Sequence, residues 1–338
     1  MTRPGTATAT AHANIALIKY WGKADDRLIL PRTSSLSLTL NELYATTTVR
    51  FLDDAHEGDA DRATIDGVPV TERALARIVA LLDLVRERAG IGAPAEITSL
   101  NTVPTAAGLA SSASGFAALT GAAAAAAGLS LDPRELSRLA RRGSGSASRS
   151  IFGGLAIWHA GTDDASSYAE PLGVSADGDD FAAQLAIVVL VLDAGQKAVS
   201  SREAMRRTVQ TSPEYEPWVR RHADQLAEAL DAVAHRDLAR LGEVAEANAL
   251  GMHATMRAAT PPVDYLTDAS HAALWAVRDA RAAGVPAWAT MDAGPNVKVL
   301  TRADQAEALA ARLRERLAPS VPNLRTIVTH AGPALKVI

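Results

Sequence analysis

The sequence contains no cysteine, which excludes disulfide bonds, thiol nucleophiles and metal sites built on cysteine. Its eight histidines are scattered, and no pair has metal-ligand spacing with carboxylates nearby, so we expect them on the surface or in the core. Basic residues are not in excess either, because 34 lysines and arginines against 38 acidic residues give a net charge of −4. This balance argues against nucleic-acid binding.

Apolar segments that would target or anchor the protein are also missing. The start, MTRPGTATAT, lacks the apolar core of a signal peptide. Residues 101–128 carry no charge, but they are mostly Ala, Gly, Ser and Thr and too weakly apolar to span a bilayer. We therefore expect a buried helix there, and a cytoplasmic protein with no membrane partner.

The chain of 338 residues is longer than most single cores, so two packed lobes are expected. An apolar content of 48% and a charged content of 21% are typical of a globular enzyme. The polar stretch 161–180 either separates the lobes or forms a surface loop. We place an N-terminal domain at residues 1–182 and a C-terminal domain at residues 183–338.

Hydrophobic patterning predicts the main elements. Helices are expected at 71–89, 133–142 and 303–317 and over most of 214–281, and strands at 35–51, 95–99, 185–192, 287–291, 297–300 and 324–328. The strict alternation at 35–40 indicates a half-buried strand, whereas the unbroken apolar run at 185–192 indicates a strand buried on both faces. Asp132, Pro133 and Glu135 are typical of a helix start, and Gly90 of a helix end.

Two loops of small residues are candidates for anion binding. The first leads through Ser111 and Ser112 into a helix, whose free N–H groups would favour a phosphate, although such a start more often reflects close packing. The second, GSGSASRS at 143–150, is either a plain linker or a turn within a domain. It contains Arg149, whose guanidinium could hold a carboxylate through two bonds.

Charged residues at strand ends add three further candidates. Lys23 could bind a phosphate or lie exposed on the surface. Ser200, Ser201 and Arg202 follow the apolar strand, where they could form a site or only cap a helix. Asp292 lies on a Gly-Pro turn between two strands, where its carboxylate either accepts turn N–H groups or acts as a base.

Four of these stretches together resemble the diphosphomevalonate decarboxylase family of the GHMP kinase superfamily. They are ANIALIKYWGK at 13–23, PTAAGLASSASG at 104–115, RRGSGSASRS at 141–150 and MDAGPN at 291–296. Lys197 with the following SSR is a weaker fifth match. The resemblance implies a two-lobed α+β GHMP kinase fold, with a ribosomal-S5-like N-terminal domain and a ferredoxin-like C-terminal domain, and usually a homodimer.

The activity implied by the resemblance is the ATP-dependent decarboxylation of mevalonate 5-diphosphate to isopentenyl diphosphate, with ADP, phosphate and carbon dioxide. A tertiary hydroxyl leaves poorly, so ATP first converts it to a phosphate ester, and Mg²⁺ is expected with ATP. The alternatives are a relative that acts on mevalonate 5-phosphate or mevalonate, and a metabolite sensor without catalysis. A sensor would have no need for Asp292, Lys23 and Arg149 together.

The resemblance also assigns residues to roles. The catalytic set comprises Asp292 at the substrate 3-hydroxyl, Arg149 at the substrate carboxylate and Lys197 near the transferring phosphate. The substrate-binding set comprises Tyr20, Lys23, Ser144, Gly145, Ser146, Arg149, Ser201, Arg202 and Met205. The ATP-binding set comprises Pro104, Ala107, Gly108, Leu109, Ala110, Ser111 and Ser112. No protein metal ligands are implied.

One departure from the family pattern is visible. Many members have Cys in GSGSACRS where this chain has Ser148. The exchange is small and polar, and it lies beside Arg149 rather than on it, so we expect activity to be retained.

Overall fold

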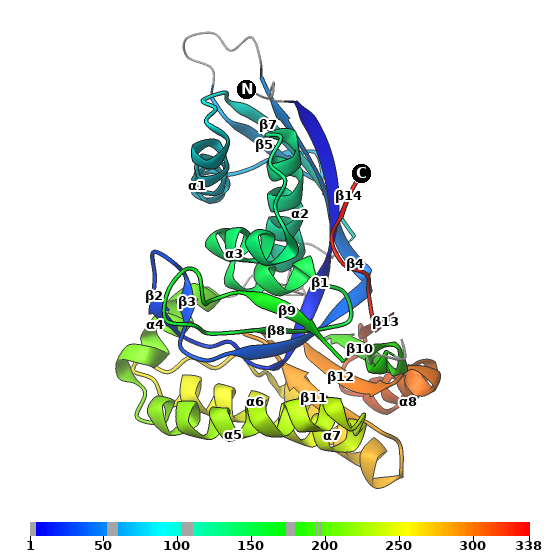
Figure 1. Ribbon diagram of the computed structural model, residues 1–338. Helices are drawn as coiled ribbons and strands as arrows, with labels where there is room; N and C mark the ends of the chain where they lie inside the picture. The colour runs from blue at the N-terminus through cyan, green and yellow to red at the C-terminus, as the bar shows by residue number, and fades with distance from the viewer. Residues whose placement is uncertain (1–4, 53–59, 103–110, 174–179, 194, 196–197) are drawn as a thin grey trace.

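The computed structural model describes residues 5–52, 60–102, 111–173, 180–193, 195 and 198–338, and Figure 1 shows their arrangement. The ATP-binding residues expected at 104 and 107–110, and Lys197, lie outside the described residues. Within the described part, an eight-stranded sheet with helices α1 to α3 forms one layer system. A four-stranded sheet with helices α5 to α8 forms the other.

The first sheet has the order β14-β1-β4-β7-β5-β6, and β8 and β9 extend it from β4. Its central strand β4 (Ser35–Phe51) pairs with β1 (Thr6–Ile18) along one edge. Along the other edge, its first residues pair with β8 (Leu155–Trp158) and its last with β7 (Ala95–Asn101). The remaining strands are β5 (Arg62–Ile65), β6 (Val68–Pro69), β9 (Ala169–Leu172) and β14 (Lys336–Val337).

Helices α1 (Glu72–Ala89), α2 (Ser111–Ala126) and α3 (Pro133–Gly143) lie together beside this sheet (Figure 1). The alanine-rich α2 is buried over most of its length, because small side chains let it pack closely against β1, β4 and the neighbouring helices. The expected signals are confirmed: Asp132 and Glu135 form a capping box on α3, and Gly90 ends α1 with a φ of 66°.

The second sheet has the order β11-β12-β10-β13 and is antiparallel throughout. Its strands are β10 (Leu185–Val191), β11 (Trp288–Met291), β12 (Val297–Arg302) and β13 (Arg325–His330). Val188 and Leu190 of β10 pack with α7 (Asp268–Ala282) and α8 (Ala306–Leu317). Ile187 and Val189 pack instead against β1 and β4 of the first sheet. The strand is therefore buried on both faces, as its apolar run predicted.

Two helices of the second layer system also contact the first sheet. Helices α5 (Tyr215–Ala234) and α6 (Leu238–Arg257) run side by side below the sheets in Figure 1, and α6 also contacts β1. Helix α4 (Ser201–Thr211) lies near the short strands β2 (Lys23–Asp25) and β3 (Leu30–Pro31). The 3₁₀ segments are η1 (Gly145–Ile151), η2 (Phe181–Gln184) and η3 (Ala303–Gln305). Among the described residues, no helix combines the length and apolarity needed to cross a membrane.

Three details differ from the sequence-based expectations. Residues 35–40 are buried on both faces rather than one, because the second sheet and its helices cover β4. The small-residue segment after α3 is the 3₁₀ helix η1 rather than an open loop. The polar stretch 161–180 contains β9, which pairs with β8 and so belongs to the first sheet.

Candidate active site

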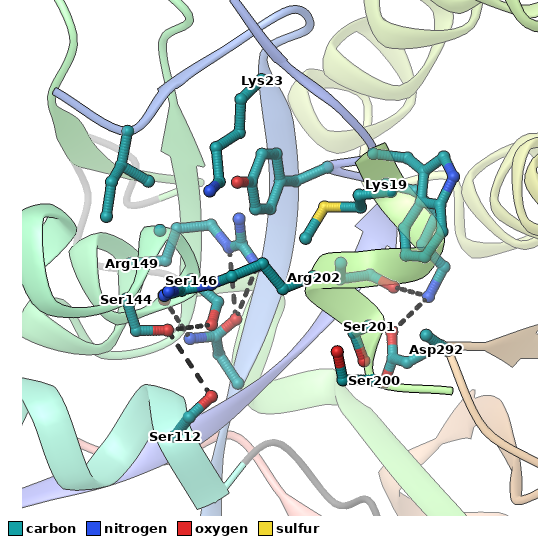
Figure 2. Close-up of a pocket in the computed structure, with 18 of the residues that line it drawn as sticks. Lys19, Lys23, Ser112, Ser144, Ser146, Arg149, Ser200, Ser201, Arg202 and Asp292 are labelled. Carbon is teal, nitrogen blue, oxygen red and sulfur yellow. Dashed lines mark hydrogen bonds and ion pairs between the residues drawn. The ribbon is translucent and has the colours of Figure 1, made fainter. Parts of the chain in front are cut away.

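A cavity of about 390 Å³ lies where β1, α2, η1, α4 and the β11–β12 turn meet (Figure 2). Among the described residues, it is lined by five cationic side chains and a single carboxylate. The cations are Lys19, Lys23, Arg77, Arg149 and Arg202, and the carboxylate is Asp292. A cavity with this excess of positive charge is suited to ligands that carry several negative charges.

Arg149 lies on the floor of the cavity and is only 2% exposed. Its Nε and Nη2 donate to Asn14 Oδ1 at 3.2 and 3.0 Å, and its Nη1 donates to Ser35 Oγ at 2.6 Å. Asn14 is itself fixed, because its amide donates to the Ser146 carbonyl and to Ser150 Oγ. A guanidinium has five N–H groups, so one remains on each terminal nitrogen of Arg149. That pair can hold a carboxylate end-on.

Asp292 follows β11 and lies between two lysines that come from distant parts of the chain. Lys19 Nζ, just after β1, contacts Asp292 Oδ1 at 2.8 Å and also donates to the Ala16 carbonyl at 2.7 Å. Lys298 Nζ, on β12, lies 3.2 Å from Asp292 Oδ2. The two lysine side chains are 2% and 1% exposed, whereas 28% of the Asp292 side chain is exposed. The carboxylate therefore faces the cavity from between two buried cations.

These contacts fix the charge states at the floor of the cavity. Withdrawal from solvent would by itself raise the pKa of Asp292, but the Lys19 and Lys298 ammonium groups reverse this and hold that pKa well below its usual range. Burial lowers the pKa of Lys19 to about 8, against the opposing effect of Asp292. Burial likewise lowers the pKa of Arg149 to about 10. At neutral pH the site thus holds one ionised carboxylate among cations.

The mouth of the cavity carries further cations from separate elements. Lys23 projects from β2 and pairs with Asp26 at 2.7 Å, and Arg202 projects from the first turn of α4 (Figure 2). Ser200 caps α4 through the Glu203 amide, and Ser201 begins the helix, so the N-terminus of α4 is part of the cavity wall. The positive end of a helix dipole adds to the attraction for an anion.

The two small-residue segments meet on another wall. Ser111 and Ser112 form the first turn of α2, and Ser144 lies between α3 and η1. Ser144 Oγ lies 3.5 Å from Ser112 Oγ and 3.4 Å from Ser146 Oγ (Figure 2). Gly145 lies against the ring of Tyr20, which stacks edge-on with Trp158 at a centroid distance of 4.8 Å. This wall offers hydroxyl groups and a helix N-terminus without bulky side chains.

A second pocket of about 240 Å³ adjoins the first and shares Arg77, Ser111 and Ser112 with it. Its other described lining residues are mostly apolar or hydroxyl-bearing, and most of them come from β5, β7, α1 and α2. Arg77 lies at the junction, donates to the Gly143 carbonyl and packs over the Phe116 ring at 4.7 Å. The two pockets together form a polar space joined to a less polar one, with the first turn of α2 between them.

The cavity brings together most residues that the sequence singled out. All the expected substrate-binding residues line it, as do Asp292, Ser111 and Ser112; the substrate-binding residues are Tyr20, Lys23, Ser144, Gly145, Ser146, Arg149, Ser201, Arg202 and Met205. Ser148 is not among the described residues that line the cavity, and its Oγ donates to the Gly145 carbonyl at 2.7 Å. Pro104, Ala107, Gly108, Leu109, Ala110 and Lys197 lie outside the described residues.

Sequence reasoning gave no role to several residues that the structure places in or beside the site. Asn14 and Lys19 belong to the quoted segment 13–23, so their position beside Lys23 was an available signal. Lys298 follows the MDAGPN segment by two residues, and an isolated lysine in an apolar strand is unusual enough to have indicated a buried partner. Arg77 lies on an ordinary amphipathic helix, and nothing in its sequence context indicated the cavity.

Comparisons with known families match both parts of the chain. Residues 11–169 match the diphosphomevalonate decarboxylase-like N-terminal domain, and residues 187–333 match the mevalonate 5-diphosphate decarboxylase C-terminal domain. A diphosphomevalonate decarboxylase of Aspergillus fumigatus is 38% identical over 331 residues, covering 93% of this chain and 81% of that protein. The Homo sapiens diphosphomevalonate decarboxylase is 34% identical over 337 residues, covering 90% and 79%.

Solved structures give the same result. A structure of MDDEF in complex with MVAPP, AMPPCP and magnesium superimposes with a TM-score of 0.90 at 45% identity and covers 98% of each chain. Mevalonate diphosphate decarboxylase from Staphylococcus aureus superimposes with a TM-score of 0.92 at 43% identity, covering 99% of this chain and 98% of that one. These matches confirm the expected α+β fold of the GHMP kinase type.

Proposed function

This chain belongs to the diphosphomevalonate decarboxylase family, and from that membership we propose how its cavity carries out the family's reaction. The chain is an ATP-dependent decarboxylase that converts mevalonate 5-diphosphate to isopentenyl diphosphate, ADP, phosphate and carbon dioxide in the mevalonate pathway. One observation supports the assignment of roles most strongly. An ionised carboxylate and a guanidinium with two free N–H groups lie together on the floor of a cavity that is otherwise cationic.

Arg149 binds the substrate carboxylate in this proposal. Its Nε and Nη2 donate to Asn14, and its Nη1 donates to Ser35. The orientation of the guanidinium is therefore set before a ligand arrives. The substrate carboxylate then accepts the remaining N–H on each terminal nitrogen. Preorganisation of this kind lowers the entropic cost of placing the reacting group.

Asp292 accepts a hydrogen bond from the substrate 3-hydroxyl and orients it toward the terminal phosphate of ATP. The depressed pKa of Asp292 makes it a weak base in the resting site. Phosphoryl transfer passes through a loose transition state, in which the attacking oxygen has formed little bond to phosphorus. The hydroxyl proton becomes acidic only as that bond forms, so a well-placed carboxylate can take it late. The structure thus favours orientation over early proton abstraction as the main role.

The decarboxylation that follows needs no further protein base. The bond between C3 and the phosphorylated oxygen breaks, and phosphate leaves with the electron pair. The bond between C2 and the carboxylate carbon breaks in turn, and its electron pair forms the alkene between C2 and C3. Lys19 lines the cavity beside Asp292, where its charge would stabilise the departing phosphate.

The nucleotide lies across the first turn of α2 in this proposal. Ser111 and Ser112 offer hydroxyl groups and helix N–H groups to phosphates, and the adjoining pocket of about 240 Å³ offers a less polar space for the base. The reaction uses ATP and Mg²⁺, as the MDDEF complex with AMPPCP and magnesium supports. The described residues contain no group of three or more His, Asp or Glu that could hold a metal. Mg²⁺ would therefore be held mainly by nucleotide phosphates, as is usual for this ion, and would neutralise their charge.

Lys23, Arg202, Ser201 and the N-terminus of α4 bind the diphosphate of the substrate. These groups come from two different elements at the mouth of the cavity, away from the pair that handles the 3-hydroxyl and carboxylate. Tyr20, Ser144, Gly145, Ser146 and Met205 shape the space between. Lys197, which follows β10, is proposed to act near the transferring phosphate on the strength of the sequence resemblance alone.

The remaining assignments also stay proposals. We propose a homodimer in the cytoplasm, without nucleic-acid or membrane partners, because the family usually forms homodimers and a net charge of −4 argues against nucleic-acid binding. We also propose the division into domains at residues 1–182 and 183–338. The two family matches, at 11–169 and 187–333, are compatible with this boundary.

The experiment that tests the function measures ADP and carbon dioxide after addition of MgATP with mevalonate 5-diphosphate, mevalonate 5-phosphate or mevalonate. We expect both products in equal amounts with the diphosphate, and far slower turnover with the other two. Asp292→Asn keeps the size of the side chain but lowers its basicity, and loss of a general base or orienting carboxylate typically costs about 10²–10⁴-fold in rate. Equal turnover of the monophosphate would move the chain to a relative that acts on that substrate.

A further inference from the structure

We infer that Lys298 is a positioning residue for the reaction: it holds the second carboxylate oxygen of Asp292 from the side away from the cavity, so that the carboxylate keeps its place when Lys19 turns to an incoming anion. The inference rests on the role proposed above for Asp292. Lys298 itself touches neither reactant, and it acts only through the carboxylate.

The two lysines beside Asp292 occupy different positions. Lys19 lines the cavity, and its Nζ donates to Asp292 Oδ1 and to the Ala16 carbonyl, which leaves one N–H for a ligand (Figure 2). Lys298 is not among the described residues that line the cavity. It lies on β12, 1% exposed, with its Nζ 3.2 Å from Asp292 Oδ2 and 3.4 Å from the Asn296 carbonyl. A ligand can therefore compete for Lys19 but cannot reach Lys298.

The backbone around Asp292 is already fixed by contacts that do not involve either lysine. Asn296 Oδ1 accepts the amide protons of Leu192 and Asp193, and its Nδ2 donates to the Asp193 carbonyl at 3.0 Å. Ser270 Oγ donates to the Pro295 carbonyl at 2.6 Å. These bonds tie the β11–β12 turn to β10 and α7. These backbone contacts do not fix the side-chain torsions of Asp292. The contact with Lys298 restrains those torsions.

A purely structural role would be filled better by an apolar residue. Lys298 is a buried residue within the apolar strand β12, and its neighbours Val297, Val299 and Leu300 are also buried. Burying an ammonium group is costly, and apolar residues of similar volume usually serve stability as well or better. A lysine here is explained by what it does to Asp292.

The titratable groups that face Asp292 come from four elements, and together they determine how pH acts on it. Lys19 lies after β1 and Lys298 on β12, and both are close cations. His253 on α6 is buried, and burial lowers its pKa to about 3, so it is neutral at working pH. Arg149 on η1 is the next cation. Removal of the Lys298 charge raises the pKa of Asp292, so protonation, and with it the loss of activity on the acid side, occurs at a higher pH.

The test compares Lys298→Met with wild type by single-turnover ADP formation, by kcat and KM, and by the acid limb of the pH–rate profile. Met matches the length of the lysine stem without its charge; if that variant does not fold, Lys298→Gln provides the same comparison. We expect kcat to fall by about 10²-fold, the loss typical of a catalytic group misplaced by about 1 Å. Both KM values should change little, and the acid limb should move to higher pH.

Two further variants separate positioning from a structural effect. In an Asp292→Asn background, Lys298→Met should lower kcat no further, because its effect passes through that carboxylate. Thr301→Val, also fully buried on β12, removes a hydrogen bond to the Pro286 carbonyl and should lower Tm without lowering kcat. Unchanged kcat and acid limb in Lys298→Met, or an equal loss in the Asp292→Asn background, would overturn the inference. If Asp292→Asn alone retains full activity, the role proposed for Asp292 fails instead.

Discussion

Arg149 shows how a single side chain can be assigned from its hydrogen bonds. Three of its N–H groups are used by Asn14 and Ser35, and these bonds leave one N–H on each terminal nitrogen of a residue that lines the cavity. A lysine at this position would carry the same charge but would lack the planar fork. We therefore expect the planar shape of the Arg149 guanidinium, and not its charge alone, to matter where the substrate carboxylate binds.

Arg149→Lys tests that statement. We expect turnover to fall by about 10²-fold or more, because the substrate carboxylate loses its fixed orientation, with ATP affinity little changed. The measurement is kcat for mevalonate 5-diphosphate beside the dissociation constant of a nucleotide analogue. Arg302→Lys, an exposed arginine paired with Asp304 outside the cavity, is the matched control and should be fully active. Wild-type turnover in Arg149→Lys would leave Arg149 as a structural ion-pair partner.

Lys19 leads to a prediction about pH. Burial lowers its pKa to about 8, so the free enzyme loses this positive charge as pH rises through that value. We expect kcat/KM for mevalonate 5-diphosphate to fall over the same range, because kcat/KM reports the ionisations of free enzyme. In Lys19→Arg the cation persists to higher pH, so the descending limb should move upward even if the maximum rate is lower. A limb that stays in place in this variant belongs to another group.

At the scale of elements, local signals and long-range contacts differ in what the sequence can reveal. The capping box at Asp132 and the apolar run of β10 depend on neighbours in the chain, and both were predicted correctly. The 3₁₀ helix η1 is held by Arg149, Ser148 and Asn14, and the last of these is more than a hundred residues away. Strand β14 exists only because it pairs with β1. Such elements follow from tertiary contacts that no local pattern encodes.

The candidate site also contains features that the sequence reveals and features that depend on long-range contacts. Its motifs could be recognised one at a time, because each has a distinctive run of small or charged residues. The pairing of Lys19 with Asp292 joins residues 273 positions apart, and the sequence contained no signal for it. The question left open for Asp292, between a turn residue and a base, could be addressed only once its two lysine partners were visible.

The close packing of Gly145, the first residue of η1, leads to a prediction about that helix. A Cβ added at Gly145 would lie 2.8 Å from the Trp158 ring and 3.0 Å from the Tyr20 ring, so the segment that carries Ser146 and Arg149 would have to shift. We expect Gly145→Ala to raise KM for the substrate and to lower kcat, with a loss of Tm of a few degrees from overpacking. Gly92→Ala, where an added Cβ meets nothing within 4 Å, is the control and should behave as wild type. Normal kinetics in Gly145→Ala would show that η1 tolerates displacement.

Across the whole molecule, the distribution of charge matters more than its sum. The chain carries a net charge of −4, yet the described part of the cavity has five cations and one carboxylate. Anionic reactants thus meet a surface that is negative on average and a cavity that is positive. Four of the five cations come from the N-terminal half of the chain, and Arg202 comes from α4, which follows β10 of the second sheet. The positive field therefore depends on the two layer systems being packed together.

This arrangement predicts a specific dependence on salt. Ions screen charges over about 8 Å at physiological ionic strength, so added KCl should raise KM for mevalonate 5-diphosphate through the partly exposed groups at the cavity mouth. The Arg149–Asn14 contacts on the floor are buried and should be affected less. Lys23→Met removes one of the mouth cations, and we expect it to raise KM at low salt and to reduce the slope of log KM against log salt. Its effect on kcat should be small, because Lys23 lies away from the 3-hydroxyl in the proposed arrangement.

The control for this prediction is Arg206→Met. Arg206 is an exposed α4 residue paired with Glu203, so the change removes a charge that is nearby but outside the cavity lining, and it should leave the slope unchanged. An equal slope for wild type and Lys23→Met would mean that Lys23 does not contact the diphosphate, and Arg202 and the N-terminus of α4 would then have to hold it.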